Sequence, residues 1–162
     1  MPDARTRAFL GFVAAAISVL TFHQGMLAFL HLFGWSPFVP YRSTPVPPFA
    51  IPYIANVCFW SGLYGVVFGL LWPRFTVPLW CSGLVLGVIS AVIAMFIVGP
   101  IKGYPFAYDW QPWPMARSFL VNGFWGIGLG LILPMLMPRG LKVFSAPIVP
   151  SAPAGVRESL PH

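Results

Sequence analysis

Charged residues are scarce in this chain of 162 residues: Asp, Glu, Lys and Arg together make up 7% of it, and only three of them are acidic. A soluble domain of this size needs far more charge to cover its surface. The three carboxylates, Asp3, Asp109 and Glu158, all lie outside the long apolar runs. This position argues against a metal enzyme and against a proton pump that depends on a membrane-embedded acid.

Cysteine and histidine are also few. Cys58 and Cys81 lie in or beside apolar stretches and form no CxxC pair, so redox chemistry is not indicated. His23 and His31 are eight residues apart on one predicted helix, about 12 Å along its axis, and His162 lies near the end of the chain. One chain could therefore not place two histidines on opposite sides of a haem. We predict no cofactor and no metal site.

Apolar residues dominate what remains, with 58% hydrophobic residues and a mean hydropathy of +0.82. Four runs are long enough to cross ~30 Å of hydrocarbon, which takes about 20 residues. These runs are residues 8–33, 53–72, 77–98 and 117–137. Because lipid offers the backbone no hydrogen-bond partner, each run should be helical. The prediction is an all-α integral membrane four-helix bundle over residues 1–144.

The basic residues stand singly at the ends of these runs, which is typical of topology signals and argues against a nucleic-acid partner. If the N-terminus is cytoplasmic, six are inside: Arg5, Arg7, Arg74, Arg139, Lys142 and Arg157. Three are then outside: Arg42, Lys102 and Arg117. The positive-inside rule favours this orientation. We therefore predict a multi-pass protein of the bacterial inner membrane with both termini in the cytoplasm.

The two halves of the chain resemble each other. Phe59-Trp60 and Pro73-Arg74 match Phe124-Trp125 and Pro138-Arg139 at an offset of 65 residues, and Gly65 matches Gly130 at the same offset. The first helices match more weakly at an offset of 72, where four residues pair: Gly11, Val13, Ile17 and Ser18 with Gly83, Val85, Ile89 and Ser90. This pattern predicts two tandem hairpins in a parallel repeat. Chance likeness of two Gly-rich apolar helices is the alternative.

Small residues recur four positions apart on all four predicted helices, a spacing that lets helices approach closely. The pairs are Gly11/Ala15, Gly65/Gly69, Gly83/Gly87 and Gly126/Gly130. Packing inside one bundle is the favoured interpretation, and a homo-oligomer interface is the alternative.

Polar residues gather toward the predicted outer half of the bundle, while the inner half is almost wholly apolar. The candidates for an outward-facing polar pocket are His23, Gln24, Asn56, Asn122, Lys102 and Arg117. Polar groups in a membrane are costly and indicate a functional site. Hydrogen bonding between helices is the simpler explanation for His23 and the asparagines.

Proline is concentrated outside the helices. The predicted outer loops, residues 34–52 and 99–116, mix prolines with aromatic residues and should be neither helix nor strand. They could cap a cavity, grip a partner or anchor the chain at the interface. The tail, residues 145–162, is also Pro-rich and is predicted to be disordered.

Four motifs together resemble a family of short four-helix inner-membrane proteins of proteobacteria, usually described only as hypothetical. The motifs are Phe22-His23-Gln24-Gly25, Ala50-Ile51-Pro52, the run at residues 59–65 and the run at residues 121–126. The likeness extends from about Gly11 to Leu136. It implies a bacterial membrane protein and carries over no activity and no site residue.

Three functions fit these features. The first is a non-catalytic accessory or scaffold subunit that packs in the bilayer against a larger membrane complex or copies of itself. The second is a channel or carrier for a small solute or ion with an outward-facing polar pocket. The third is an enzyme that acts on a lipid or quinone at the outer leaflet with His23 as acid or base, but no second catalytic group stands at a recognisable spacing. We therefore expect a protein that is not an enzyme.

Overall fold

A computed structural model describes residues 2–46 and 49–137 of the chain. The described part is mostly helical, as predicted, and four of its helices are each long and apolar enough to span a membrane. The first comprises α1 (Ala4–Ser18), η1 (Val19–His23) and α2 (Gln24–Leu32). The others are α3 (Tyr53–Leu71), then α4 (Leu79–Ile93) continued by η3 (Ala94–Val98) and α5 (Gly99–Ile101), and finally α6 (Pro112–Leu136). The predicted tail lies outside the described residues.

Two helices begin earlier in the chain than their apolar runs predicted. The carboxylate of Asp3 accepts the Thr6 backbone N–H at 2.7 Å and caps α1, so this helix begins at Ala4. Hydrogen bonds from Thr6 also hold the pKa of the Asp3 carboxyl below its usual range. Helix α6 begins at Pro112, where proline suits the first helical turn because no helical partner is needed for its missing N–H.

The outer loops contain more regular structure than the prolines predicted. In the first loop, strands β1 (Pro45–Val46) and β2 (Ile51–Pro52) form a short antiparallel pair, so the prediction of no strand there is wrong. Proline tolerates such a two-stranded edge because the N–H that it lacks can face away from the partner strand. In the second predicted loop, residues 99–116, α5 (Gly99–Ile101) and the first turn of α6 (from Pro112) are helical, so the prediction of no helix there is wrong as well. At the other end of the molecule, the short helix η2 (Trp72–Arg74) leads from α3 toward α4.

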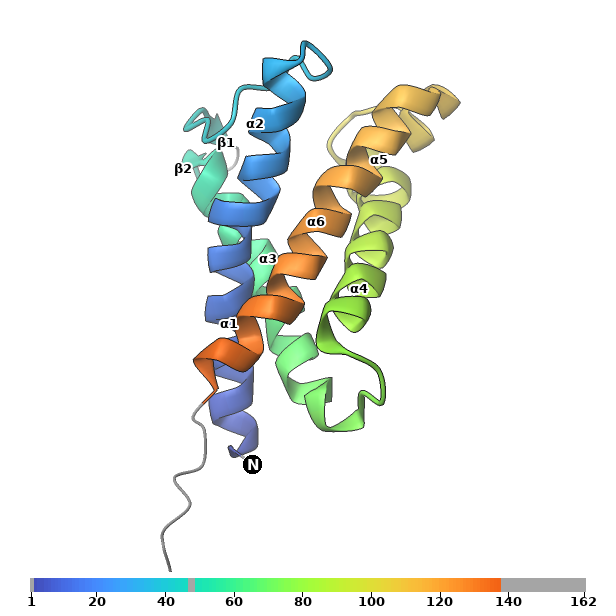
Figure 1. Ribbon diagram of the computed structural model, residues 1–162. Helices are drawn as coiled ribbons and strands as arrows, with labels where there is room; N and C mark the ends of the chain where they lie inside the picture. The colour runs from blue at the N-terminus through green and yellow to red at the C-terminus, as the bar shows by residue number, and fades with distance from the viewer. Residues whose placement is uncertain (1, 47–48, 138–162) are drawn as a thin grey trace, which may run out of the picture.

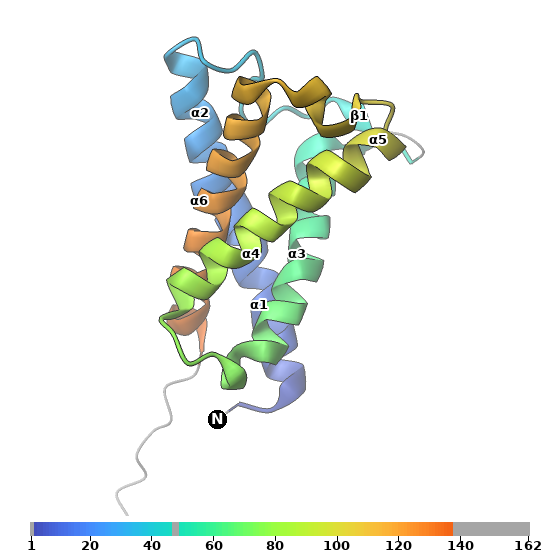
Figure 2. The ribbon, with the colours of Figure 1, turned by 90° about the vertical axis from the view of Figure 1, so that its right-hand side faces the viewer.

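The helices run alternately in opposite directions (Figures 1 and 2). The N-terminus, the connection between α3 and α4, and the last turn of α6 lie at one end, which we call the N-terminal end. Two long loops lie at the other end, which we call the loop end: the first loop (residues 33–52) and the second loop (residues 102–111).

The helices pack as two close pairs, α1 with α3 and α4 with α6. In the first pair, an added Cβ on Gly11 would overlap the carbonyl oxygen of Gly65, and one on Gly69 would overlap that of Arg7. Backbones can approach this closely only where no side chain separates them.

Glycines hold the second pair together in the same way. An added Cβ on Gly83 would overlap the carbonyl oxygen of Gly126, and one on Gly87, a turn further along α4, would overlap that of Asn122. The six glycines named from the sequence as candidates for helix packing therefore all lie at backbone contacts within this one chain: Gly65, Gly69, Gly83, Gly87, Gly126 and Gly130. The contacts agree with packing inside one bundle, and these six positions are not left free for a second copy.

The contacts of the second pair repeat those of the first. The contact of Gly126 with Gly83 corresponds to that of Gly65 with Gly11. One turn further along, the contact of Gly130 with Leu79 corresponds to that of Gly69 with Arg7. The second helices of the pairs therefore correspond at an offset of 61 residues (126 minus 65), whereas the Phe-Trp motifs match at 65. The difference of four residues is about one helical turn, which preserves the helix face but moves each contact along the axis.

This shift puts the two motif tryptophans in different surroundings. Trp60 is 56% exposed, and its Nε1–H donates to Asn56 Oδ1 at 3.1 Å on the same helix. Trp125 is 2% exposed and joins the two pairs, because its Nε1–H donates to the Ala15 carbonyl at 3.1 Å and its own carbonyl accepts the Ser18 hydroxyl at 2.6 Å. Ala14, Ala15, Leu129 and Leu133 complete this core between α1 and α6.

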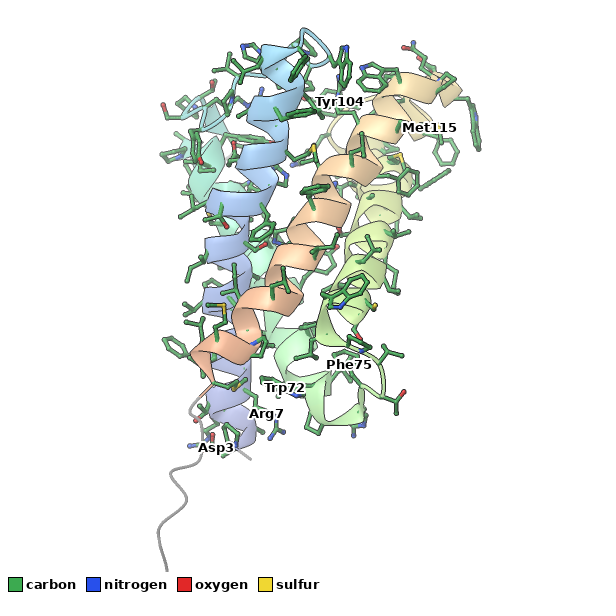
Figure 3. The ribbon with its side chains drawn as sticks, in the orientation of Figure 1. Asp3, Arg7, Trp72, Phe75, Tyr104 and Met115 are labelled. Atoms are coloured by element: carbon green, nitrogen blue, oxygen red, sulfur yellow. The ribbon has the colours of Figure 1, made fainter. Side chains whose placement is uncertain are left out.

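Large apolar side chains cover the outside of the helices, as Figure 3 shows for the molecule as a whole. Phe9, Phe59, Val85 and Met135, one from each of the four long helices, are all more than half exposed. The inside holds small residues and buried Ser18, Gln24 and Ser90, together with a few large side chains such as Trp125, Phe68 and Met95. Soluble proteins rarely expose so much contiguous apolar surface. Four such helices suggest a multi-pass membrane protein.

The glycine contacts generate a stability prediction. Replacing Gly126 by alanine should lower the free energy of unfolding by roughly 1–3 kcal/mol, because the new methyl group meets the Gly83 backbone. Thermal unfolding followed by circular dichroism in a mild detergent measures the change. Gly25→Ala is the matched control, since an added Cβ there meets nothing within 4 Å. Equal melting temperatures for both variants would contradict the packing described.

Candidate functional site

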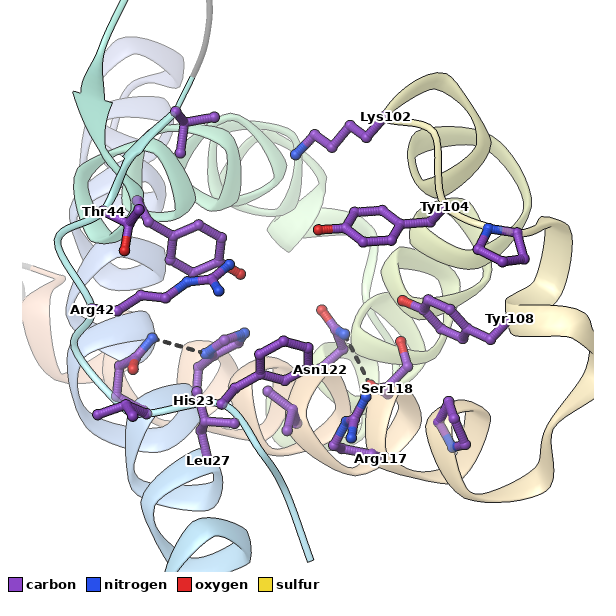
Figure 4. A pocket seen from close by; sticks show the side chains of 18 of the residues that line it. His23, Leu27, Arg42, Thr44, Lys102, Tyr104, Tyr108, Arg117, Ser118 and Asn122 are labelled. Carbon is purple, nitrogen blue, oxygen red and sulfur yellow. Dashed lines mark hydrogen bonds between the residues drawn. The ribbon is translucent and has the colours of Figure 1, made fainter.

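A cavity of about 800 Å³ opens at the loop end (Figure 4). Its walls come from the first helix, the first loop, the second loop and the beginning of α6. The close contact of α4 with α6 extends from Leu79 to the contact of Gly87 with Asn122, and beyond it α4 and α5 lean away from α6 (Figure 2). The glycine contact thus acts as a crossing point, and the helices diverge on its loop side.

Five of the six predicted pocket residues line this cavity: His23, Gln24, Lys102, Arg117 and Asn122. The sixth, Asn56, does not line the cavity. Its side chain accepts the hydrogen bond of Trp60 on the exposed side of α3. Several lining residues were not among the predicted ones, chiefly Phe38, Arg42, Tyr53, Tyr104, Tyr108 and Asp109. The aromatic residues among the loop prolines were the only sequence signal for them.

Three cations line the cavity, and they come from three parts of the chain. Arg42 belongs to the first loop, Lys102 follows α5, and Arg117 lies in the second turn of α6. Asp109 is the only carboxylate among the lining residues. The described lining therefore carries an excess of positive charge.

Aromatic rings hold the two guanidinium groups. The Arg42 guanidinium carbon lies 3.9 Å from the centroid of the Tyr53 ring and 5.5 Å from that of Phe38. The Arg117 guanidinium lies 4.8 Å from the same Phe38 centroid. Cation–π contact orients a guanidinium over a ring and leaves the N–H groups at its edge available. Within the described residues, the side-chain hydrogen bonds of the cavity involve Gln24, His23, Ser90 and Asn122 and none of the three cations.

Neutral polar groups form the deeper part of the cavity. Gln24 Oε1 accepts the Tyr41 backbone N–H at 2.8 Å, which fixes the orientation of the amide. The amide nitrogen therefore faces His23 Nδ1, at 3.2 Å, and Nδ1 must accept this hydrogen bond. His23 is thus neutral in this arrangement, with its proton on Nε2. Asn122 is held by the Ser118 carbonyl at 2.9 Å and by the Ser90 hydroxyl at 3.2 Å.

A π-helical segment fastens the first loop to the first helix. In η1 the backbone N–H of Gln24 bonds to the carbonyls of Thr21 and Val19 rather than to that of Leu20. The Leu20 carbonyl instead accepts the Tyr41 hydroxyl at 2.7 Å. Such segments often occur at functional sites because they free backbone groups for other partners. Trp113 secures the other side of the loop by donating its Nε1–H to the Trp35 carbonyl at 2.7 Å.

The second loop forms the opposite wall through an unusual backbone turn. In η4 (Phe106–Trp110), the residues from Ala107 to Trp110 have φ between 49° and 58°, the left-handed region. This conformation costs roughly 1–2 kcal/mol for each non-glycine residue. Packing of Phe106 and Trp110 against Phe96 holds the turn, and Tyr108 and Asp109 then line the cavity. Strained backbone that persists beside a cavity indicates a functional constraint.

The described residues contain no group of three His, Cys, Asp or Glu side chains that could hold a metal ion. The cavity instead offers hydrogen-bond donors, cations and aromatic surface. Such a lining can bind and orient a ligand.

Comparisons with known proteins give no family for this chain. No family model matches it, and no curated protein and no solved structure matches it. The resemblance to short four-helix inner-membrane proteins of proteobacteria therefore stays a prediction from sequence motifs.

The geometry predicts that water reaches the cavity but not the contact between α4 and α6. In a chain with Cys58 and Cys81 replaced by serine, Ser118→Cys should react with a water-soluble maleimide because this residue lines the cavity. Ser90→Cys is the control, since Ser90 is only 7% exposed and should react only after denaturation. Mass spectrometry of the labelled protein measures both. Fast reaction at both positions would show that the pairs are not packed as described.

Proposed function

We propose that this protein is a multi-pass protein of the bacterial inner membrane that binds a small ligand in the cavity at its loop end, without catalysis, and that this end faces the periplasm. The observation that carries the proposal is the cavity itself. Its volume of about 800 Å³ falls in the range of sites for small organic molecules, and its lining combines aromatic walls with a few oriented polar groups.

Binding is favoured over conduction because the cavity is closed toward the N-terminal end. There the glycine contacts hold the helices together, and Trp125, Leu129 and Leu133 fill the space between α1 and α6. A channel would need polar groups or water to continue through this region. A carrier would have to separate these packed backbones to release its solute on the other side.

The proposed orientation depends on the positive-inside rule. Among the described residues, Arg5, Arg7 and Arg74 lie at the N-terminal end and the three cavity cations lie at the loop end. The described residues are therefore evenly divided, and the excess that the rule needs depends on Arg139, Lys142 and Arg157, which lie outside the described residues. Trp35, Tyr104 and Trp110, all exposed at the loop end, support its position at a membrane interface.

We also propose that the two helix pairs descend from one ancestral hairpin. The matching glycine contacts support this, as do the π-helical segments η1 and η3 in the first helix of each pair. At the offset of 61 residues Tyr64 corresponds to Trp125, and these two rings lie against each other with centroids 6.2 Å apart. Equivalent residues meet in this way near the axis that relates two halves of a parallel repeat.

Filling the cavity should test the binding proposal. The protein extracted in a mild detergent should carry a bound small molecule that native mass spectrometry detects. Ser118→Trp should abolish this adduct because the indole occupies the cavity. Val85→Trp is the control, since Val85 is 59% exposed on α4 away from the cavity. An adduct that all three proteins retain would place the molecule on the outer surface and contradict the proposal.

An accessory role in a larger membrane complex is the second candidate function, and one observation favours it. A shallow apolar groove of about 590 Å³ lies along the first helix and α6. Its lining residues are Thr21, Phe22, Gly25, Met26, Phe29 and Phe124. An added Cβ on Gly25 would meet nothing within 4 Å, so this glycine serves no contact inside the chain. A transmembrane helix of a partner could approach closely there.

The accessory role predicts that filling this groove breaks a complex. Gly25→Trp should reduce a native assembly to the mass of the single 17.8 kDa chain with its detergent, as measured by native mass spectrometry. Val67→Trp, at a half-exposed position of α3, should leave the assembly intact. A single chain in every case, including the unmodified protein, would rule the accessory role out.

A further inference from the structure

We infer that the ligand of the cavity is an organic phosphate, either the headgroup of a phospholipid or a soluble phosphate ester. This inference depends on the proposed function, since it names the chemistry of the ligand that the same cavity would take. It starts from the juxtaposition of Arg42, Lys102 and Arg117 around one space, with the guanidinium groups held over aromatic rings.

The first step concerns charge. The cavity lining holds three cations and one carboxylate, and the two arginine residues are half-buried. Cations that are partly withdrawn from water repel one another and lose solvation, and an anion between them reverses both costs. Phe38 lies against both Arg42 and Arg117 and offsets part of this repulsion, so the two cations stay together when no anion is bound.

The second step concerns direction. Figure 4 shows Arg42, Lys102 and Arg117 approaching the cavity from three different sides. A planar carboxylate is matched by a single guanidinium fork, whereas the several oxygens of a phosphate accept hydrogen bonds from donors around it. The spread of the donors therefore favours a phosphate.

The third step concerns size. A free phosphate ion would leave most of the volume of about 800 Å³ empty. Phe38, Tyr53, Tyr104 and Leu27 provide aromatic and apolar surface for an attached organic part. Deeper in the cavity, His23 and Asn122 are neutral and can hydrogen-bond hydroxyl or carbonyl groups of that part.

The test uses the full-length protein, purified in a non-ionic detergent and stripped of lipid. The probes are phosphatidylglycerol, glycerol 3-phosphate and neutral diacylglycerol, and the measured quantity is the dissociation constant from intrinsic tryptophan fluorescence. We expect one of the two phosphate probes to bind saturably and diacylglycerol not to bind. Arg42→Gln and Arg117→Gln should each weaken binding by about tenfold or more, since each removes a charge-assisted hydrogen bond.

Arg74→Gln is the matched control, because Arg74 is an exposed cation at the N-terminal end. It should change the dissociation constant little. The melting temperatures of Arg42→Gln, Arg117→Gln and Arg74→Gln, measured without probe, must agree. If Arg117→Gln is unstable, Arg117→Lys replaces it as a variant that keeps the charge at this position. If the two arginine variants weaken the binding of phosphatidylglycerol, the ligand is a lipid. If they weaken the binding of glycerol 3-phosphate, the ligand is a soluble phosphate ester.

Two outcomes would overturn the inference and leave the proposed function standing. One is diacylglycerol binding as tight as that of the phosphates, unchanged by the arginine variants but abolished by Ser118→Trp. The other is a neutral molecule as the native adduct of the cavity. Equal weakening by Arg74→Gln would reveal unspecific attraction and overturn the inference as well. If no probe binds and the Ser118→Trp variant still carries the native adduct, both the inference and the proposed function are wrong.

Discussion

The contact of backbone on backbone at glycine decides how the helices of this protein are arranged. Apolar side chains are no help to helix association in lipid, because the acyl chains are equally apolar. Close approach of helix backbones gains dispersion contacts that lipid cannot replace. Gly11 with Gly65 in one pair, and Gly83 with Gly126 in the other, supply that approach together with the neighbouring glycine contacts. Many of the large apolar side chains, such as Phe9, Phe59 and Met135, are thereby left facing outward.

The cavity is a consequence of where these contacts lie. They hold the pairs together toward the N-terminal end, and beyond the contact of Gly87 with Asn122 the second pair diverges. The two loops then close the sides of the opening, and each loop is held in place by a different interaction. Tyr41 bonds to the carbonyl that η1 leaves free, and the left-handed turn at residues 107–110 brings Tyr108 to the cavity. Packing in one half of the bundle thus leaves the cavity in the other half.

The likeness between the two halves is close only within the pairs. Between the pairs, α1 packs on α6 through Trp125 and Ser18, and α3 makes no comparable contact with α4 within the described residues. The position equivalent to Trp125 carries Tyr64, a smaller ring that lies against it. The contact between the pairs is therefore asymmetric, with the first helix packed on α6, and the cavity is lined by unlike residues from the two halves.

Much of this arrangement could be predicted from the sequence alone. The scarcity of charge and four apolar runs determined a bundle of four long helices, because length and hydropathy are local properties of the chain. His23, Gln24, Lys102, Arg117 and Asn122 could be named as a group because each is polar at one end of such a run.

Only the tertiary structure decided the rest. It placed Asn56 on the outer side of α3, since a helix periodicity does not reveal which face a neighbour covers when nearly every residue is apolar. It matched the glycine contacts of the two helix pairs at an offset of 61 residues (126 minus 65), one helical turn away from the match of the Phe-Trp motifs, because backbone contact at glycine depends on the packing partner and not on the neighbouring sequence. It also brought Phe38 and Arg42 from the first loop to Arg117, a contact between segments far apart in the chain that no local pattern encodes.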